Sequence, residues 1–199
     1  MLNATHQQKL ILASQSPRRS YLLNQAGLEF DVIPSRFDED RVPLTDPEGY
    51  VRTLAESKAE DVAKTHEQCW VIGADTIVLM DGAILGKPKS AEDARRMLCR
   101  LSGRVHQVLT GFAICCRAKD HLFSDVATTD VHFKDLSPNE VEWYIHTDEP
   151  FDKAGAYAIQ GLGTFLVRQI KGSYTNVVGL PVCEVIEHLI RMGVVQYRV

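Results

Sequence analysis

The chain has 199 residues, of which 45% are hydrophobic and 24% charged, and its formal net charge is -4. This balance is typical of a globular chain that buries its own core, and the negative charge argues against nucleic-acid binding. Because we find no apolar run of membrane-spanning length and no signal peptide, we expect a cytoplasmic protein. The five cysteines form no C-x-x-C pair, so we expect reduced, mostly buried thiols rather than disulfides or a zinc site.

The first half of the chain is predicted to alternate strands and helices. The apolar KLILA segment is typical of a buried strand. Ser16 can cap a helix that has Pro17 at its first position and ends at Gly27. Asp81-Gly82 is a hairpin turn signal. In chain order we predict a strand at 9–13, a helix at 17–27, a strand at 29–35, a long polar loop at 36–46, a helix at 47–65 and a strand at 69–80, with residues 83–88 leaving the turn.

The second half continues the alternation. Ser90 caps one predicted helix, and Ser137, Pro138 and Glu140 resemble the capping box of another. In order we predict a helix at 91–103, strands at 106–116 and 128–136, a helix at 137–146, strands or turns at 155–163, 164–170 and 176–181, and a C-terminal helix from Pro181. Because strands and helices alternate irregularly, with at least one hairpin, we expect an α/β fold with a mixed, twisted sheet.

Two adjacent arginines, Arg18 and Arg19, fall at the start of the first predicted helix. A helix N-terminus carries partial positive charge and unpaired N–H groups, so two cations there are locally unfavourable. A bound phosphate would reverse that sign, because arginine binds phosphate through two donors, and Ser14 and Ser16 add hydroxyl groups. The pattern indicates an anion site or, alternatively, two solvated arginines on a surface helix.

Asp75 and Lys58 both contradict their apolar surroundings. Asp75 lies within WVIGADTIVLM, and a central strand rarely buries a carboxylate without a cation, a metal or several donors. Lys58 shares a helical stripe with Val51 and Leu54, so its stem should point inward while its ammonium requires an anion. Alternatively, Asp75 is a strand-end aspartate satisfied by backbone N–H groups, and Lys58 extends to solvent.

Three further polar residues are candidates on local signals. Glu39 lies among several acids of the polar loop, which could include a metal ligand or could be solvated. Lys87 follows the predicted hairpin. Gln160 precedes glycines, which let backbone approach a ligand closely, and its amide could read the edge of a base; alternatively the segment is only a turn.

Together these residues supply cations and carboxylates, the equipment for metal-assisted chemistry on a polyphosphate. The chain lacks the pattern G-x-x-x-x-G-K-[ST], so a P-loop nucleotide site is not expected. No G-x-G-x-x-G follows the first strand either, which argues against a Rossmann dinucleotide site.

With these residues assembled, the chain resembles the Maf family of nucleotide pyrophosphatases along nearly its whole length. The shared pieces are S-x-S-P-R-R, F-D-E, LAESKA, GADT, L-GKP, LSG, TDEPFDKAGAYAIQGLG and GSYTNVVGLP. The resemblance implies the fold of inosine triphosphate pyrophosphatases. In that fold a single domain, here residues 1–199, has two α/β lobes around an elongated mixed sheet, with the active site in the cleft between the lobes. It also implies hydrolysis of nucleoside triphosphates to the monophosphate and pyrophosphate with a divalent metal, which could be Mg²⁺, Mn²⁺ or Co²⁺.

The resemblance also implies roles for individual residues. Asp75 matches the proton acceptor and, with Glu39, would hold the metal. Arg18, Thr76 and Gln160 match positions tied to base specificity. The remaining polar positions of the site are matched by Ser14, Arg19, Glu39, Lys58 and Lys87, of which we assign the glutamate and the two lysines to catalysis and Ser14 and Arg19 to substrate binding.

Two branches of the family differ at two places. The branch acting on 7-methyl-GTP carries a tryptophan after the proline and a KSEG-like segment, whereas this chain has Arg18 and AGAYAIQGLG. Tryptophan could stack on a charged methylated purine, while the Gln160 amide suits the imide edge of uracil or thymine. We therefore expect a dTTP/UTP pyrophosphatase, as a homodimer with no nucleic-acid or membrane partner. The alternatives are hydrolysis of 7-methyl-GTP or another non-canonical nucleotide, and a septum-formation regulator that acts by binding.

Overall fold

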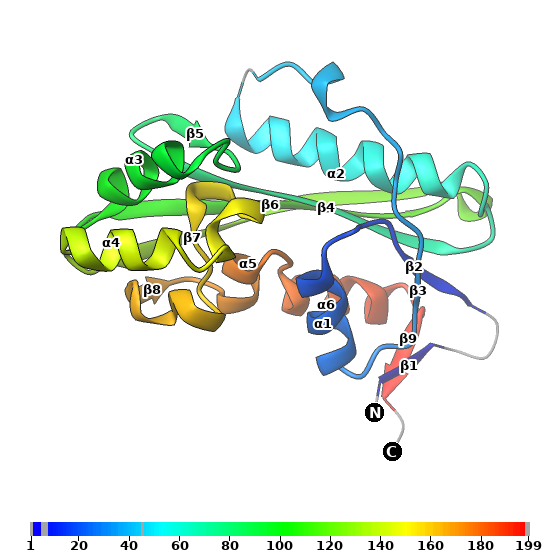
Figure 1. Cartoon of the computed structure of the whole chain (residues 1–199). Coiled ribbons are helices and arrows are strands. Elements are labelled where there is room, and N and C mark those ends of the chain that lie inside the picture. The colour runs from blue at the N-terminus through cyan, green and yellow to red at the C-terminus, as the bar shows by residue number, and fades with distance from the viewer. Residues whose placement is uncertain (1, 5–7, 45, 198–199) are drawn as a thin grey trace. The chain divides into compact units, whose positions relative to one another are not determined.

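A computed structural model describes residues 2–4, 8–44 and 46–197 of the chain (Figure 1). Residue 45 of the predicted polar loop lies outside the described residues. The strands are β1 (Leu2–Ala4), β2 (Leu10–Leu12), β3 (Asp31–Val32), β4 (Trp70–Met80), β5 (Ala83–Leu85), β6 (Val105–Cys116), β7 (His121–Phe133), β8 (Val167–Lys171) and β9 (Val195–Tyr197). The helices are α1 (Pro17–Gln25), α2 (Pro47–Ala63), α3 (Ala91–Leu101), α4 (Pro138–Ile145), α5 (Tyr174–Val178) and α6 (Val182–Arg191).

The sheet is mixed, as the sequence predicts. Its strand order is β3-β2-β4-β6-β7-β8, with β5 beside β4. β2 pairs in parallel with both β3 and β4, whereas β4 with β5 and β7 with β8 are antiparallel. β1 and β9 form a separate antiparallel pair. The predicted α/β class is confirmed.

The chain divides into two compact units, which we describe separately. Unit 1 comprises Met1–Asp75, Thr110–Ala127 and Gly179–Val199, and unit 2 comprises Thr76–Leu109 and Thr128–Val178. Within the described ranges, no helix is both long and apolar enough to cross a bilayer.

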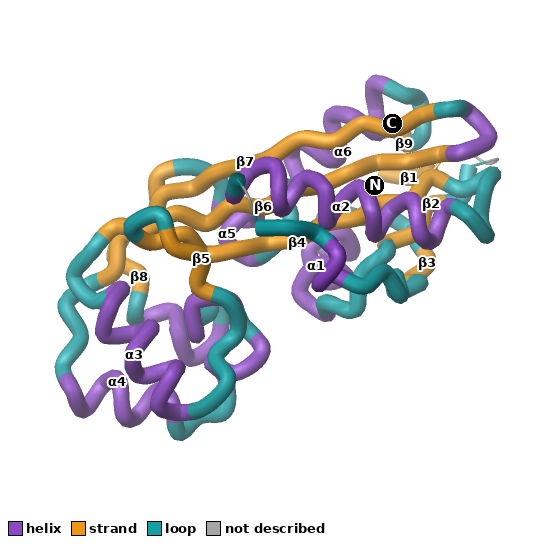
Figure 2. The backbone as a smooth tube through the Cα atoms, turned by 90° about the horizontal axis from the view of Figure 1, so that it is seen from above, coloured by secondary structure: helices purple, strands orange, loops and turns teal. Residues whose placement is uncertain are grey.

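In unit 1, α2 covers one side of the strands, and α1 and α6 lie on the other (Figures 1 and 2). Ile11 and Val71 of the strands pack with Ala55 and Ala59 of α2 in one buried cluster. A Cβ atom at Gly73 would lie 2.2 Å from the carbonyl oxygen of Ala55 and 2.7 Å from the backbone nitrogen of Ala59. Glycine at this position therefore allows α2 to lie directly against β4.

In unit 2, α3 and α4 lie side by side (Figure 2). Leu98 of α3 and Tyr144 of α4 belong to a buried cluster that also contains Val131 of β7. The two helix starts predicted in this unit, at Ser90 and Ser137, are confirmed. Ser90 accepts a hydrogen bond from the third residue of α3, and Ser137 forms a complete capping box at α4.

Three predictions of secondary structure need correction. The strand predicted at 29–35 is shortened to the two residues of β3. This strand lies at the edge of the sheet, and both of its residues are exposed, so a longer strand there would gain little from burial. The strand predicted at 128–136 begins earlier, at His121, after a turn that ends with Asp120 in the left-handed region. Strands or turns are predicted at 176–181, whereas residues 174–178 form helix α5, in which the buried Asn176 amide donates to the carbonyl of Val108 and the hydroxyl of Thr129.

The cysteine prediction holds only in part. All five cysteines are free thiols, but only Cys115 and Cys116 are buried. Cys99 and Cys183 are exposed, so the expectation that most of the thiols are buried is wrong.

Candidate active site

Lys58 joins the two carboxylates that the sequence singles out. Its Nζ lies 2.7 Å from Oδ1 of Asp75 and 2.8 Å from Oε1 of Glu39. The side chains of Lys58 and Asp75 are only 11% and 14% exposed, whereas that of Glu39 is 53% exposed. The buried strand aspartate and the inward-facing lysine therefore supply each other with the required counterion.

The packing of α2 on β4 explains this contact. Gly73 and Asp75 are two residues apart, so they face the same side of β4. On α2, Ala55, Lys58 and Ala59 share one face because they are three or four residues apart. Since Ala55 and Ala59 close on Gly73, Lys58 is brought onto the carboxylate two residues further along the strand.

Arg19 is held in a fixed position at the start of α1. Its side chain is buried, Nε donates to the carbonyl oxygen of Gly179 at 2.7 Å, and Nη1 donates to Oγ of Ser14 at 3.0 Å. Ser16 occupies the N-cap position, but its side chain makes no capping hydrogen bond; its backbone N–H donates to Oγ of Ser14 at 3.2 Å. The predicted side-chain cap is wrong, and Ser14 organises this turn instead. Arg18 is partly exposed.

The charges of unit 1 act on one another. Burial lowers the pKa of Arg19 and the neighbouring Arg18 adds to that effect, while the negative charges of Asp75 and Glu39 oppose it. Three cations, counting Lys58, thus lie with two carboxylates among the predicted site residues of this unit. Such a cluster has a net positive charge that suits an anionic ligand.

Tyr50 is a neighbour of these carboxylates that the sequence analysis did not identify. Burial raises the pKa of its phenol, and the negative charges of Asp75 and Glu39 raise it further. The signal was available, because Tyr50, Leu54 and Lys58 follow one another at four-residue spacing on one face of α2.

The remaining predicted residues belong to unit 2. Thr76 follows Asp75 directly on β4 and is partly exposed. Lys87 is exposed in the loop after β5, and Gln160 is partly exposed between 3₁₀ turns at 154–156 and 161–165. The backbone N–H of Gly155 donates to the carbonyl oxygen of Gly86 at 3.0 Å, so the segments carrying Lys87 and Gln160 are bonded to each other.

The carboxylate pair fits an oxygen-preferring divalent cation. Asp75 and Glu39 both approach the Lys58 ammonium, so two hard oxygen ligands lie near each other. Mg²⁺ is commonly held by one or two carboxylates together with substrate phosphates and water. Among the residues that the structure describes, no three His, Cys, Asp or Glu side chains gather as metal ligands, which differs from a cage made by protein alone.

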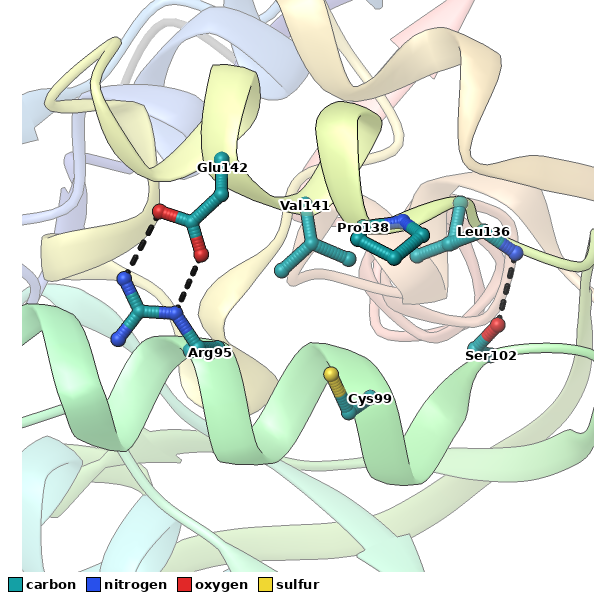
Figure 3. Close-up of a pocket in the computed structure, with 7 residues that line it drawn as sticks. All are labelled: Arg95, Cys99, Ser102, Leu136, Pro138, Val141 and Glu142. Atoms are coloured by element: carbon teal, nitrogen blue, oxygen red, sulfur yellow. Dashed lines mark hydrogen bonds and ion pairs between the residues drawn. The ribbon is translucent and has the colours of Figure 1, made fainter.

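A cavity of about 210 Å³ lies between α3 and α4 (Figure 3) and contains none of the nine predicted site residues. Its lining arginine, Arg95, is already paired with Glu142, and Nη2 donates to Oε2 of that carboxylate at 2.8 Å. Because the charge of Arg95 is neutralised there and Leu136, Pro138 and Val141 are apolar, the cavity lacks the donors that a triphosphate requires.

In comparisons with known proteins, the matching family model and the most similar curated sequences agree with one another. The family described as Maf-like protein matches residues 9–192. A dTTP/UTP pyrophosphatase of Geotalea uraniireducens is 51% identical over 94% of this chain and 96% of its own length. A dTTP/UTP pyrophosphatase of Geobacter sp. strain M21 is 52% identical over 92% and 95%. Among solved structures, the Staphylococcus aureus Ham1 protein aligns over 80% of each chain, with 16% identity and a TM-score of 0.48.

Proposed function

Because the chain belongs to the Maf-like protein family, we propose that it hydrolyses dTTP and UTP to the nucleoside monophosphate and pyrophosphate. The two relatives that are 51% and 52% identical in sequence are named dTTP/UTP pyrophosphatases, which supports the reaction and the substrates. The structural observation that carries the proposal is the Lys58 contact with Asp75 and Glu39, beside the buried Arg19. It combines a base, oxygen ligands and cations, which water attack on a phosphate anhydride requires.

In this proposal Asp75 accepts the proton of the water that attacks the α-phosphorus. Lys58 holds the carboxylate in one orientation through Oδ1, and Oδ2 is the oxygen we assign to the proton. Arg19, whose position is fixed by Ser14 and Gly179, would bind phosphate oxygens with Arg18, and their charge would oppose the charge that builds up in the transition state.

Asp75 and Glu39 would also hold a divalent cation, for which Mg²⁺, Mn²⁺ and Co²⁺ are candidates. When bound, such a cation neutralises phosphate charge and favours deprotonation of water. Lys87 would contribute a further positive charge to the leaving pyrophosphate.

We propose that Gln160, Arg18 and Thr76 determine the base. A glutamine amide has one acceptor and two donors, so it can pair with the alternating N–H and C=O groups of the uracil or thymine imide. The proposal further includes a homodimer in the cytoplasm, which sedimentation of the purified protein and cell fractionation would test.

Pyrophosphate release tests the reaction directly. The substrates are dTTP, UTP, CTP, GTP, ATP and 7-methyl-GTP, each with Mg²⁺, with Mn²⁺ and with chelator. We expect metal-dependent release mainly from dTTP and UTP. A preference for 7-methyl-GTP would retain the chemistry but contradict the roles of Arg18 and Gln160. No release from any nucleotide would overturn the proposed function.

Asp75→Asn tests the assignment of the base. We expect a fall in kcat of about 10²–10⁴-fold, because the amide cannot accept the proton. Asp125→Asn is the matched control, since Asp125 is exposed on β7. A folded Asp75→Asn protein with the kcat of the control would remove Asp75 from this role.

A further inference from the structure

Glu149 fastens the backbone directly after Gln160. Its Oε2 accepts a hydrogen bond from the N–H of Leu162 at 2.9 Å, and its Oε1 accepts one from the N–H of Gly163 at 3.0 Å. Oε1 also accepts a hydrogen bond from the hydroxyl of Tyr144 at 2.8 Å. Hydrogen bonds to an ionised acceptor are stronger than neutral ones, so this carboxylate fixes the chain two and three residues beyond Gln160.

Tyr144 extends the same bonding to the other side of Gln160. While its hydroxyl donates to Glu149, the oxygen accepts a hydrogen bond from the buried N–H of Ala158 at 3.1 Å. Tyr144 is fully buried, and burial together with the bond to Glu149 raises the pKa of its phenol, so it remains a proton donor at neutral pH. The backbone is thus held on both sides of Gln160 by one connected pair of side chains.

The glycines after Gln160 are explained by this pair. A Cβ atom at Gly161, where φ is +68°, would lie 2.5 Å from Oε2 of Glu149. A Cβ atom at Gly163 would lie 2.3 Å from the carbonyl oxygen of Ala158 and 2.6 Å from the hydroxyl of Tyr144. From the sequence, these glycines indicate either close approach of the backbone to a ligand or only a turn. The structure shows that they let the backbone turn closely around an internal carboxylate and phenol.

We propose that Glu149 and Tyr144 are positioning residues that set base selectivity by fixing the Gln160 amide. The inference rests on the proposed function, in which Gln160 reads the pyrimidine. An amide can distinguish uracil from cytosine only while its donor and acceptor stay aligned with the base edge, and a misplacement of about 1 Å removes much of such an effect.

A double-mutant cycle with Gln160 tests the proposal. The measured quantity is the ratio of kcat/KM for UTP to kcat/KM for CTP. Glu149→Gln places an amide N–H₂ where a carboxylate oxygen accepted a bond, and we expect the ratio to fall about tenfold. Gln160→Ala should lower the ratio at least as much, and the double variant should equal Gln160→Ala. Glu142→Gln, which changes a carboxylate of α4 outside this pair, should leave the ratio unchanged.

A second measurement reports on position without catalysis. Amide hydrogen exchange of Leu162 or Gly163 should speed up in Glu149→Gln, because an N–H₂ group then replaces one of the two oxygens that accept hydrogen bonds from these N–H groups. It should remain slow in Glu142→Gln, which keeps both oxygens. Tyr144→Phe should speed up amide exchange of Ala158, because it removes the acceptor oxygen of that N–H. If Glu149→Gln does not fold, Tyr144→Phe replaces it in the double-mutant cycle with Gln160→Ala. If amide exchange of Leu162 and Gly163 is unchanged in Glu149→Gln and that of Ala158 is unchanged in Tyr144→Phe, the proposal is overturned.

The outcomes separate this inference from the proposed function. If Gln160→Ala loses selectivity but folded Glu149→Gln keeps it, the positioning role is wrong and the proposed function stands. Additive losses in the double variant would mean that Glu149 acts other than through Gln160. If neither Glu149→Gln nor Tyr144→Phe folds, the two residues are required for the stability of the fold, and the proposal that they set base selectivity is overturned. If the wild-type protein hydrolyses no nucleotide, the proposed function fails, and with it the selectivity role.

Discussion

Replacing Lys58 with methionine is expected to destabilise the protein far more than an ordinary surface substitution. Methionine retains the apolar stem against α2 and β4, but Asp75, only 14% exposed, loses an ammonium at 2.7 Å. Removing one partner of a buried ion pair costs about 3–5 kcal/mol, because the other charge is left uncompensated. Since the positive charge of Arg19 also acts on Asp75, we expect a loss of about 3 kcal/mol. The contact with Glu39, which is 53% exposed, should contribute less than about 1 kcal/mol of it.

Urea unfolding at neutral pH measures this effect. The double variant Lys58→Met/Asp75→Asn removes both charges of the pair and should recover about 2 kcal/mol relative to Lys58→Met. Lys64→Met is the matched control, because Lys64 is exposed at the end of the same helix, and it should change stability by less than about 0.5 kcal/mol. Equal stability of Lys58→Met and the wild type, or a double variant less stable than Lys58→Met, would refute the argument that Lys58 compensates Asp75.

Two further predictions concern the two units separately. Burial, with a smaller effect of His132, lowers the pKa of His106 from 6.5 to about 4 in the folded state. The unfolded chain therefore binds the proton more readily, and stability should fall by about 2 kcal/mol as the pH drops from 7 to 5. Urea unfolding of the wild type and of His106→Gln at both pH values checks this, and equal slopes would contradict it. Gly73→Ala would place a Cβ atom 2.2 Å from the carbonyl of Ala55, so we expect a loss of about 1–3 kcal/mol together with a lower kcat. A wild-type Tm and kcat would show that α2 can shift without disturbing the site.

The charged residues that contradict their surroundings are the most informative part of the sequence. A carboxylate within an apolar strand and a lysine on an apolar helical stripe are both costly alone, so each predicts a partner. The sequence does not say which partner. The structure brings Asp75 and Lys58 together because Gly73, which the sequence analysis leaves unused, permits the close approach of α2. Capping residues such as Ser137 are predictable for another reason, since their bonds lie within four residues.

Features that depend on contacts between distant residues are not predictable in this way. The local sequence around Arg19 is also compatible with a solvated arginine at the start of a surface helix. In the structure the side chain is buried, and its guanidinium donates to the carbonyl of Gly179. Val177 and Val178 have strand propensity, yet they belong to α5, where the neighbouring Asn176 amide is bonded to β6 and β7. Glu149 lies in an acidic, proline-containing segment that looks solvated, although its carboxylate accepts bonds from Leu162 and Gly163. In each case tertiary hydrogen bonds override the local preference.

The two carboxylate arrangements respond differently to substitution, which bears on how catalysis and selectivity are connected. Asp75 is compensated by the charge of Lys58, so a neutral replacement of either residue changes the electrostatics of the proposed chemical step. Glu149 is compensated by backbone N–H groups and the hydroxyl of Tyr144, which are dipoles without net charge. A neutral replacement of Glu149 therefore shifts hydrogen-bond geometry around Gln160 while the cations near Asp75 keep their partners. We expect substitutions at Glu149 to change the choice of base with little effect on the kcat for UTP, and substitutions at Lys58 to lower kcat for every nucleotide alike. A parallel fall in kcat for UTP and CTP in Glu149→Gln would show that the two functions are not separable in this fold.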